Sequence, residues 1–177
     1  MAAVKTLVLG IGNTLLTDEG AGIHALNLLQ SEHPYLPNTT FLDGGTLSFT
    51  LATWIEDCNN LIVFDAAEFH LPPGQIKTLI GAEMDAFLGA NKRSAHEVGL
   101  LDLIDIARLT EALPTNRALI GIQATQFGWG MQPCNEVLQA LPAAVSEAVS
   151  LIEKWSGTTL AQTSSVLKID AEHTNAE

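Results

Sequence analysis

The sequence is poor in basic residues and in cysteine, and both shortages narrow the possible functions. It holds 8 Lys and Arg against 20 Asp and Glu, which gives a formal net charge of −12. Binding to a nucleic-acid backbone needs clustered Lys and Arg, so a nucleic-acid partner is not expected. The only two cysteines, Cys58 and Cys134, form no CxxC pair, so neither a disulfide framework nor a zinc knuckle is indicated. A reduced, cytoplasmic setting is the expectation for such a chain.

Long apolar runs and the signatures of common proteases are missing as well. The N-terminal apolar run is short and contains Lys5, so we expect neither a signal peptide nor a membrane span there. The sequence contains no GxSxG elbow and no HExxH pair, and neither cysteine has an evident histidine partner. The sequence therefore shows none of the signatures of the common serine, cysteine and zinc proteases.

Enough apolar sequence is present to build one domain with a full core, because 47% of the 177 residues are hydrophobic. Segments typical of strands and of helices alternate along the chain, and the strands are apolar on both faces. We expect strands at residues 4–9, 39–42, 61–64, 75–80 and 118–122, and helices at residues 19–30, 47–56, 100–107 and 138–152. Residues 81–96 look irregular, with one helical turn near Glu83. Pro142 is expected to kink the last helix or to start a second segment.

This alternation predicts a three-layer α/β/α sandwich around a mostly parallel, twisted sheet of about five strands. The segment at residues 75–80 follows its neighbour after a short turn, so it is expected to be an antiparallel edge strand. We expect a single domain over residues 1–156. The polar residues 157–177 lack a convincing pattern and are expected to form a mobile tail.

Candidate site residues follow the predicted strands. In open sheets of this kind, ligands bind beyond the carboxyl ends of the strands, where the winding direction reverses. Asp18 and Glu19 follow the first strand, Asp43 follows the second, and Asp65 ends the third. If the first and third strands are neighbours, Glu19 and Asp65 face one crevice. The loop that carries His96 precedes a predicted helix and is expected at the same edge.

The glycine-rich turn at residues 10–22 does not fit a dinucleotide site. The fingerprint needs a third glycine where Leu15 stands, and a carboxylate at this turn would repel a pyrophosphate. A cation fits better. Glu19, Asp65 and His96 would supply two carboxylate oxygens and one imidazole nitrogen, a set that suits a transition metal such as nickel or zinc.

Taken one at a time, these residues also have structural explanations. Asp18 is expected to cap a helix, and Glu19 could be a first-turn acid stabilised by the helix dipole. Asp43, with the two glycines that follow it, is most simply a tight turn, and His96 could be an ordinary loop histidine. Asp65 is harder to explain in this way, because an acid that closes a buried strand needs a partner.

Four motifs, in order and spacing, resemble those of the maturation endopeptidases of nickel–iron hydrogenases. They lie at residues 10–22 (GIGNTLLTDEGAG), 43–46 (DGGT), 63–66 (VFDA) and 94–102 (SAHEVGLLD). The resemblance covers about residues 4–155. The first motif alone would not be specific, whereas four motifs in register are.

The resemblance implies an endopeptidase that removes a C-terminal peptide from a hydrogenase large-subunit precursor after nickel has been inserted. The family's metal-contacting Glu, Asp and His carry over onto Glu19, Asp65 and His96, which would also be the catalytic residues. The implied metal is nickel already seated in the substrate and used to recognise it. Whether that metal is also catalytic, with Asp65 or His96 accepting a proton from an activated water, stays open, as does a role for Asp43.

Two other functions are compatible with parts of the sequence. Peptidyl-tRNA hydrolases open with a similar strand followed by Gly-x-Gly-Asn. They usually continue with a Pro-Gly pair where Thr14 and Leu15 stand here, and a tRNA-binding protein should be basic. A non-catalytic, metal-binding chaperone of hydrogenase assembly would bind the nickel-loaded precursor without shortening it.

Overall fold

The computed structural model describes residues 4–90 and 95–157, and the side chains of residues 95–98 are outside that description. The expected tail beyond residue 157 lies outside the described residues. The strands are β1 (Thr6–Ile11), β2 (Thr39–Gly45), β3 (Asn60–Ala67), β4 (Ile76–Ile80) and β5 (Asn116–Gln123). The helical segments are η1 (Thr17–Gly20), α1 (Ala21–Glu32), η2 (Phe49–Leu51), α2 (Ala52–Glu56), α3 (Ala82–Ala90), α4 (Ala95–Leu109) and α5 (Asn135–Ser156).

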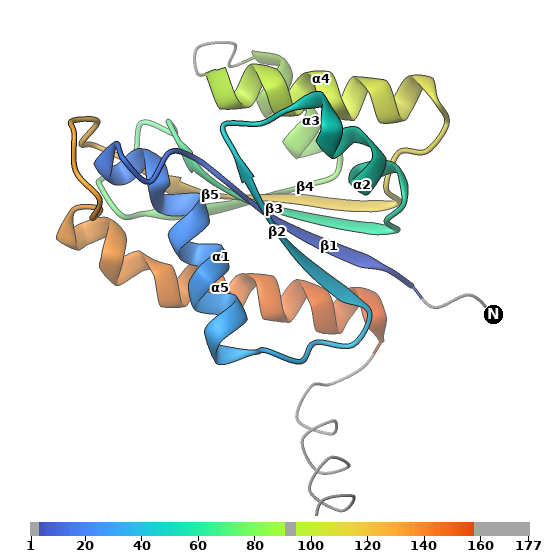
Figure 1. Cartoon of the computed structure of the whole chain (residues 1–177), viewed down its shortest axis with the longest axis horizontal. Helices are drawn as coiled ribbons and strands as arrows, with labels where there is room; N and C mark the ends of the chain where they lie inside the picture. The colour runs from blue at the N-terminus through green and yellow to red at the C-terminus, as the bar shows by residue number, and fades with distance from the viewer. Residues whose placement is uncertain (1–3, 91–94, 158–177) are drawn as a thin grey trace, which may run out of the picture.

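The five strands form one sheet in the order β2-β1-β3-β5-β4. The pairs β1–β2, β1–β3 and β3–β5 are parallel, and β4 runs antiparallel to β5 at the edge (Figure 1). This confirms the mostly parallel sheet, the antiparallel edge strand and the contact between the first and third strands. The carboxyl ends of β1, β2, β3 and β5 therefore meet at one edge, which we call the carboxyl edge.

Each face of the sheet is covered by its own helices, so the α/β/α sandwich is confirmed. Side chains alternate along β3: Ile62 and Phe64 pack into the core shared with α1 and α5, whereas Leu61 and Val63 pack into the core shared with α2, α3 and α4. Figure 1 shows these two helical layers on opposite sides of the sheet. Within the described ranges, no helix has the length and apolar character needed to cross a membrane.

The expectation of irregular structure at residues 81–96 was wrong, because α3 occupies residues 82–90 and α4 already begins at Ala95. Met84 and Leu88 are both fully buried, and their spacing of four residues places them on one face of α3. The large apolar residues of this nine-residue helix are Met84, Phe87 and Leu88, which are too few to produce a clear period in the sequence. Tertiary burial therefore decides the structure of this segment.

Two other helices differ from expectation in their limits. The helix expected at residues 47–56 begins only at Phe49, because Leu47 has a φ of +68° and Ser48 caps the next turn by accepting a hydrogen bond from Thr50 N at 3.3 Å. Of the two outcomes expected at Pro142, a kink or the start of a second segment, the second is wrong, since α5 is one helix through that residue. Pro142 costs α5 a hydrogen bond, and the buried stripe along the helix offsets that loss.

Helix α1 lies directly on the sheet because its first turn carries Gly22. A Cβ atom at this position would overlap the carbonyl oxygens of Ile11 and Phe64, which belong to β1 and β3. Only glycine permits this approach, because backbone atoms of two strands cannot yield independently. Gly22 therefore fixes η1 and α1 over the carboxyl ends of β1 and β3.

We predict that Gly22→Ala destabilises the fold by about 3 kcal/mol or more, because the added methyl group meets backbone rather than flexible side chains. The matched control is Gly89→Ala in α3, where an added Cβ meets nothing within 4 Å. That control should be neutral or stabilising by up to about 1 kcal/mol. Urea unfolding of both variants measures the difference. Equal stability of the two variants would contradict the close approach.

Candidate functional site at the carboxyl edge

The glycine-rich turn after β1 serves to position Glu19. Gly12 has a φ of +144°, and a Cβ atom there would overlap the carbonyl oxygen of Glu19. That same oxygen accepts a hydrogen bond from Asn13 N at 3.2 Å. The turn thus wraps around the backbone of η1, and η1 contacts β3. The side chain of Glu19 is partly buried.

Asp65 is a buried carboxylate at the carboxyl end of β3, with 1% of its surface exposed. The strand continues to Ala67, so Asp65 lies within β3 rather than after it, and it pairs in register with Gly121 of β5. Side chains alternate between the two faces of a strand, and Leu61 and Val63 point toward α2, α3 and α4. Asp65 is two residues beyond Val63, so it lies on the same face. A carboxylate buried to this degree is costly unless it is hydrogen-bonded or meets a positive charge.

His96 lies in the first turn of α4 and not in the preceding loop, which corrects the sequence-based placement. Its side chain is outside the described part of the structure. One turn further along, Gly99 packs against Leu47, with a distance of 3.1 Å from a built Cβ to Leu47 Cδ1. Leu47 follows the carboxyl end of β2. The first turn of α4 therefore begins at the carboxyl edge.

The fold thus brings the backbones of Glu19, Asp65 and His96 to one edge from three separate elements. Among the side chains that the structure describes, no three His, Cys, Asp or Glu residues are grouped closely enough to hold a metal ion, and His96 is not among them. The predicted three-residue metal site therefore stays a prediction.

Asp18 does not cap a helix, which corrects another expectation. The residue before α1 is Gly20, and no side chain caps that helix. Asp18 is instead fully buried, and its carboxylate accepts hydrogen bonds from the backbone N–H groups of Thr125, Gln126 and Cys134 at 2.7–2.9 Å. It therefore fastens η1 to the loop between β5 and α5.

The electrostatics of Asp18 follow from these donors. Burial alone would raise the pKa of its carboxyl group, but the three backbone N–H donors and the Cys134 thiol together hold the pKa below its usual value of 3.8. The carboxylate therefore stabilises the fold in full above that value. The contribution is lost as the pH falls through the lower pKa of the folded state.

We predict that Asp18→Asn lowers the free energy of unfolding by about 2–3 kcal/mol at neutral pH, because an amide cannot accept all the hydrogen bonds and presents its own N–H groups to backbone donors. The loss of stability below pH 4 should also be shallower than in the unmodified chain. Asp57→Asn, at an exposed ion pair with Lys5, is the control and should change stability by less than about 1 kcal/mol. Identical pH profiles for Asp18→Asn and the unmodified chain would contradict this account.

Asp43 follows the tight-turn expectation. It is exposed, and its Oδ1 accepts a hydrogen bond from Gly45 N at 2.8 Å. Gly45 has a φ of +51°, which the turn requires and which glycine adopts without strain. The observed contact is confined to the turn at the end of β2, and a site role for Asp43 stays a prediction.

Neither cysteine is poised to act as a nucleophile. Burial raises the pKa of Cys58 to about 12. Burial also raises the pKa of Cys134, and its Sγ donates a hydrogen bond to Asp18 Oδ2 at 3.3 Å. Because the thiolate is the reactive form, both residues are inert thiols at neutral pH. This agrees with the absence of a Cys–His pair in the sequence.

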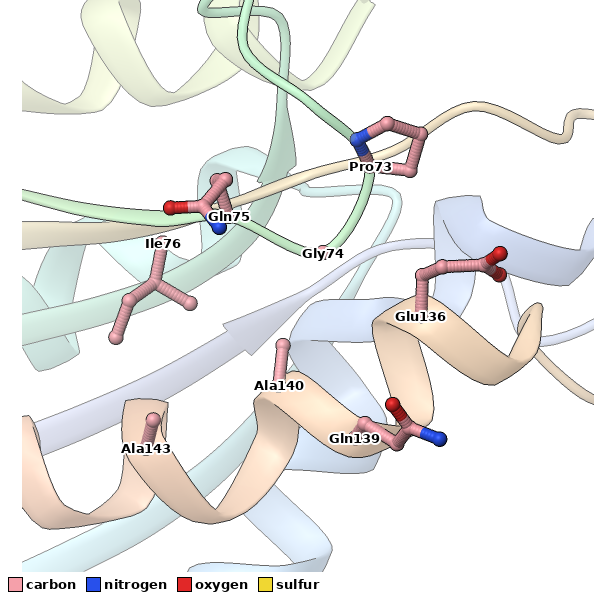
Figure 2. A pocket seen from close by; sticks show the side chains of 8 residues that line it. All are labelled: Pro73, Gly74, Gln75, Ile76, Glu136, Gln139, Ala140 and Ala143. Atoms are coloured by element: carbon pink, nitrogen blue, oxygen red, sulfur yellow. The ribbon is translucent and has the colours of Figure 1, made fainter.

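Two grooves open near the carboxyl edge. One of about 410 Å³ lies between residues 73–76 and α5. Figure 2 shows Ala140 and Ala143 along the side of α5 that faces Ile76, with the Gln139 carboxamide turned away. The other, of about 400 Å³, lies between residues 46–49 and the start of α4, where Gly99 and Asp102 line it. The second groove adjoins α4, the helix that carries His96, but neither Glu19 nor Asp65 lines it.

These observations define an α/β/α domain whose candidate site residues come from separate elements at the carboxyl edge of the sheet. A family model described as hydrogenase maturation protease matches residues 23–151. The hydrogenase expression/formation protein HupD of Bradyrhizobium diazoefficiens is 34% identical to the chain, over 98% of the chain and 94% of HupD. The chain belongs to the hydrogenase maturation protease family, and it is an endopeptidase of that family.

Solved structures agree with this assignment. The hydrogenase maturating endopeptidase HybD from Escherichia coli superposes with a TM-score of 0.81 and 28% identity, covering 85% of this chain and 93% of that one. The [NiFe] hydrogenase maturation protease HybD from Thermococcus kodakarensis has a TM-score of 0.72 and 33% identity, over 84% of this chain and 99% of that one. The likeness therefore spans nearly the whole of both solved chains.

Proposed function

We propose that the chain removes the C-terminal extension of the nickel-loaded precursor of a hydrogenase large subunit, and that Glu19, Asp65 and His96 recognise the nickel. The observation that carries this proposal is the meeting of three distant chain segments at the carboxyl edge, where Asp65 is 1% exposed. The family assignment supports the peptidase activity. The metal belongs to the substrate and not to the resting enzyme.

The chemistry of the three residues supports metal recognition. A divalent cation between Glu19 and Asp65 would lower the cost of keeping a charged carboxylate buried at position 65. Imidazole and carboxylate ligands suit nickel, and two carboxylates with one histidine leave coordination positions for the ligands that the precursor already supplies. Partial coordination of this kind allows release once the peptide has been cut.

The state of the thiols supports a mechanism without a cysteine nucleophile. Cys58 and Cys134 are both protonated at neutral pH. Cys134 is also committed to its hydrogen bond with Asp18. A thiol-directed inhibitor should therefore leave cleavage unaffected at neutral pH.

We predict that Glu19→Gln, Asp65→Asn and His96→Ala each lower the rate of precursor cleavage by about 100-fold or more, because even residues that only support a metal ligand change activity 10–100-fold. The measurement is the mass of the peptide released from nickel-loaded precursor. Matched controls are Glu32→Gln, Asp57→Asn and His33→Ala, which lie at the opposite edge of the sheet and should retain full activity. Full activity of all three site variants would refute the assignment.

We also predict that the metal-free precursor is not cut, because the three residues would then have no cation to recognise. The same precursor should be cut after nickel is restored. A chaperone without peptidase activity would bind the loaded precursor and leave its length unchanged, so electrophoresis of the mixture separates that function from the proposed one. Equal cleavage with and without nickel would contradict metal recognition.

A further inference from the structure

Four exposed apolar residues belong to two segments that are hydrogen-bonded to each other beside Glu19. Phe127, Trp129 and Met131 belong to the loop between β5 and α5, and they are 61%, 86% and 68% exposed. Leu15, in the turn after β1, is 51% exposed. We call these four residues the apolar platform. Large apolar side chains that gather on a surface, rather than being scattered singly, are typical of interaction sites.

The two halves of the platform are joined through their backbones. Gly130 N donates a hydrogen bond to Leu15 O at 3.0 Å, and Thr17 N donates to Gly130 O at 2.7 Å. Leu16 and Gly130 form a parallel β-bridge. Leu15 is therefore beside the loop positions that flank Gly130, which are Trp129 and Met131. Figure 1 shows this orange loop lying against the blue segment that contains η1.

The loop is also held from within the protein. Gln126 O accepts hydrogen bonds from Asp18 N at 3.1 Å and from Thr17 Oγ1 at 2.7 Å. The buried Asp18 carboxylate binds the N–H groups of Thr125, Gln126 and Cys134. The buried carboxylate of Asp18 therefore holds in place a loop whose large apolar side chains are exposed to solvent. A surface fixed in this way loses little conformational freedom on binding.

Other exposed apolar residues serve as a comparison. Tyr35 is 83% exposed and Leu109 is 84% exposed, values close to that of Trp129. Tyr35 lies between α1 and β2, and Leu109 ends α4, so both are at the amino edge of the sheet. Exposure alone therefore does not distinguish Trp129. Trp129 differs from Tyr35 and Leu109 because its loop carries other exposed apolar residues and is hydrogen-bonded to η1.

We propose that the apolar platform is the docking surface for the hydrogenase large-subunit precursor, an inference that rests on the proposed function. Glu19 is two residues from Thr17, within the segment that is hydrogen-bonded to the loop. A folded client that presents its metal to Glu19 must bring its surface over this segment. Tryptophan, in particular, often supplies much of the binding energy at protein interfaces.

The test is steady-state cleavage of nickel-loaded precursor by the double variant Trp129→Ala, Met131→Ser. We expect KM to rise about tenfold or more with kcat within twofold, because docking energy is lost while Glu19, Asp65 and His96 are untouched. Phe127→Ser alone should raise KM in the same direction. Tyr35→Ala is the matched control and should leave both constants unchanged. Unchanged KM in the platform variants would overturn the inference, and so would a fall in kcat alone.

Binding of the immobilised precursor, measured separately, distinguishes failure of this inference from failure of the proposed function. If the unmodified chain cuts the precursor and the platform variants bind it equally well, only the docking inference fails. If the unmodified chain binds without cutting, the peptidase function fails, and weaker binding of the variants would still support the platform. If sedimentation finds a dimer that the double variant dissociates, the occupant is a second copy and the inference is overturned.

Discussion

The architecture of the carboxyl edge depends on one buried carboxylate. Asp18 gathers three backbone N–H groups from a loop more than a hundred residues away, and so joins the start of the chain to the segment between β5 and α5. A backbone donor buried without an acceptor is costly, so removing this acceptor would release the loop and the turn together. The position of Glu19, one residue further along, follows from the same attachment.

Most of the fold could be predicted from the sequence, because buried parallel strands produce continuous apolar runs that are easily located. The antiparallel edge strand followed from its short connecting turn, whereas the contact between the first and third strands was only a condition of the reasoning, and the strand order came from the structure. The missed helix α3 shows where this reasoning stops. Its packing rests on Met84 and Leu88, which are fully buried, and on the partly buried Phe87, so the contacts that favour this helix come from residues distant in the sequence. At Pro142 the sequence left a kinked helix and a second segment open, and the packed side of α5 keeps the helix continuous.

The sequence predicted that the backbones of Glu19, Asp65 and His96 lie at one edge of the sheet, but it did not predict the different roles of the neighbouring acids Asp18 and Glu19. Asp18 and Glu19 are adjacent acids, and the sequence gives no reason to bury one rather than the other. The partners of Asp18 lie at residues 125–134, where nothing in the local pattern marks them as donors to a distant carboxylate. The exposure of Phe127, Trp129 and Met131 in the same loop is seen only in the structure. The family motifs located Glu19, Asp65 and His96 without revealing this support.

The two buried thiols can report local opening of the structure, one on each side of the sheet. Cys134 packs in the layer of α1 and α5, and Cys58 packs in the layer of α2, α3 and α4, so each reports on one side of the sheet. A thiol that is buried and protonated reacts with an alkylating reagent only when its surroundings open. Modification of Cys134 would record detachment of the loop from Asp18, whereas modification of Cys58 would record loosening of the opposite layer. The rates of the two reactions can therefore tell whether the recognition edge frays before the rest of the domain unfolds.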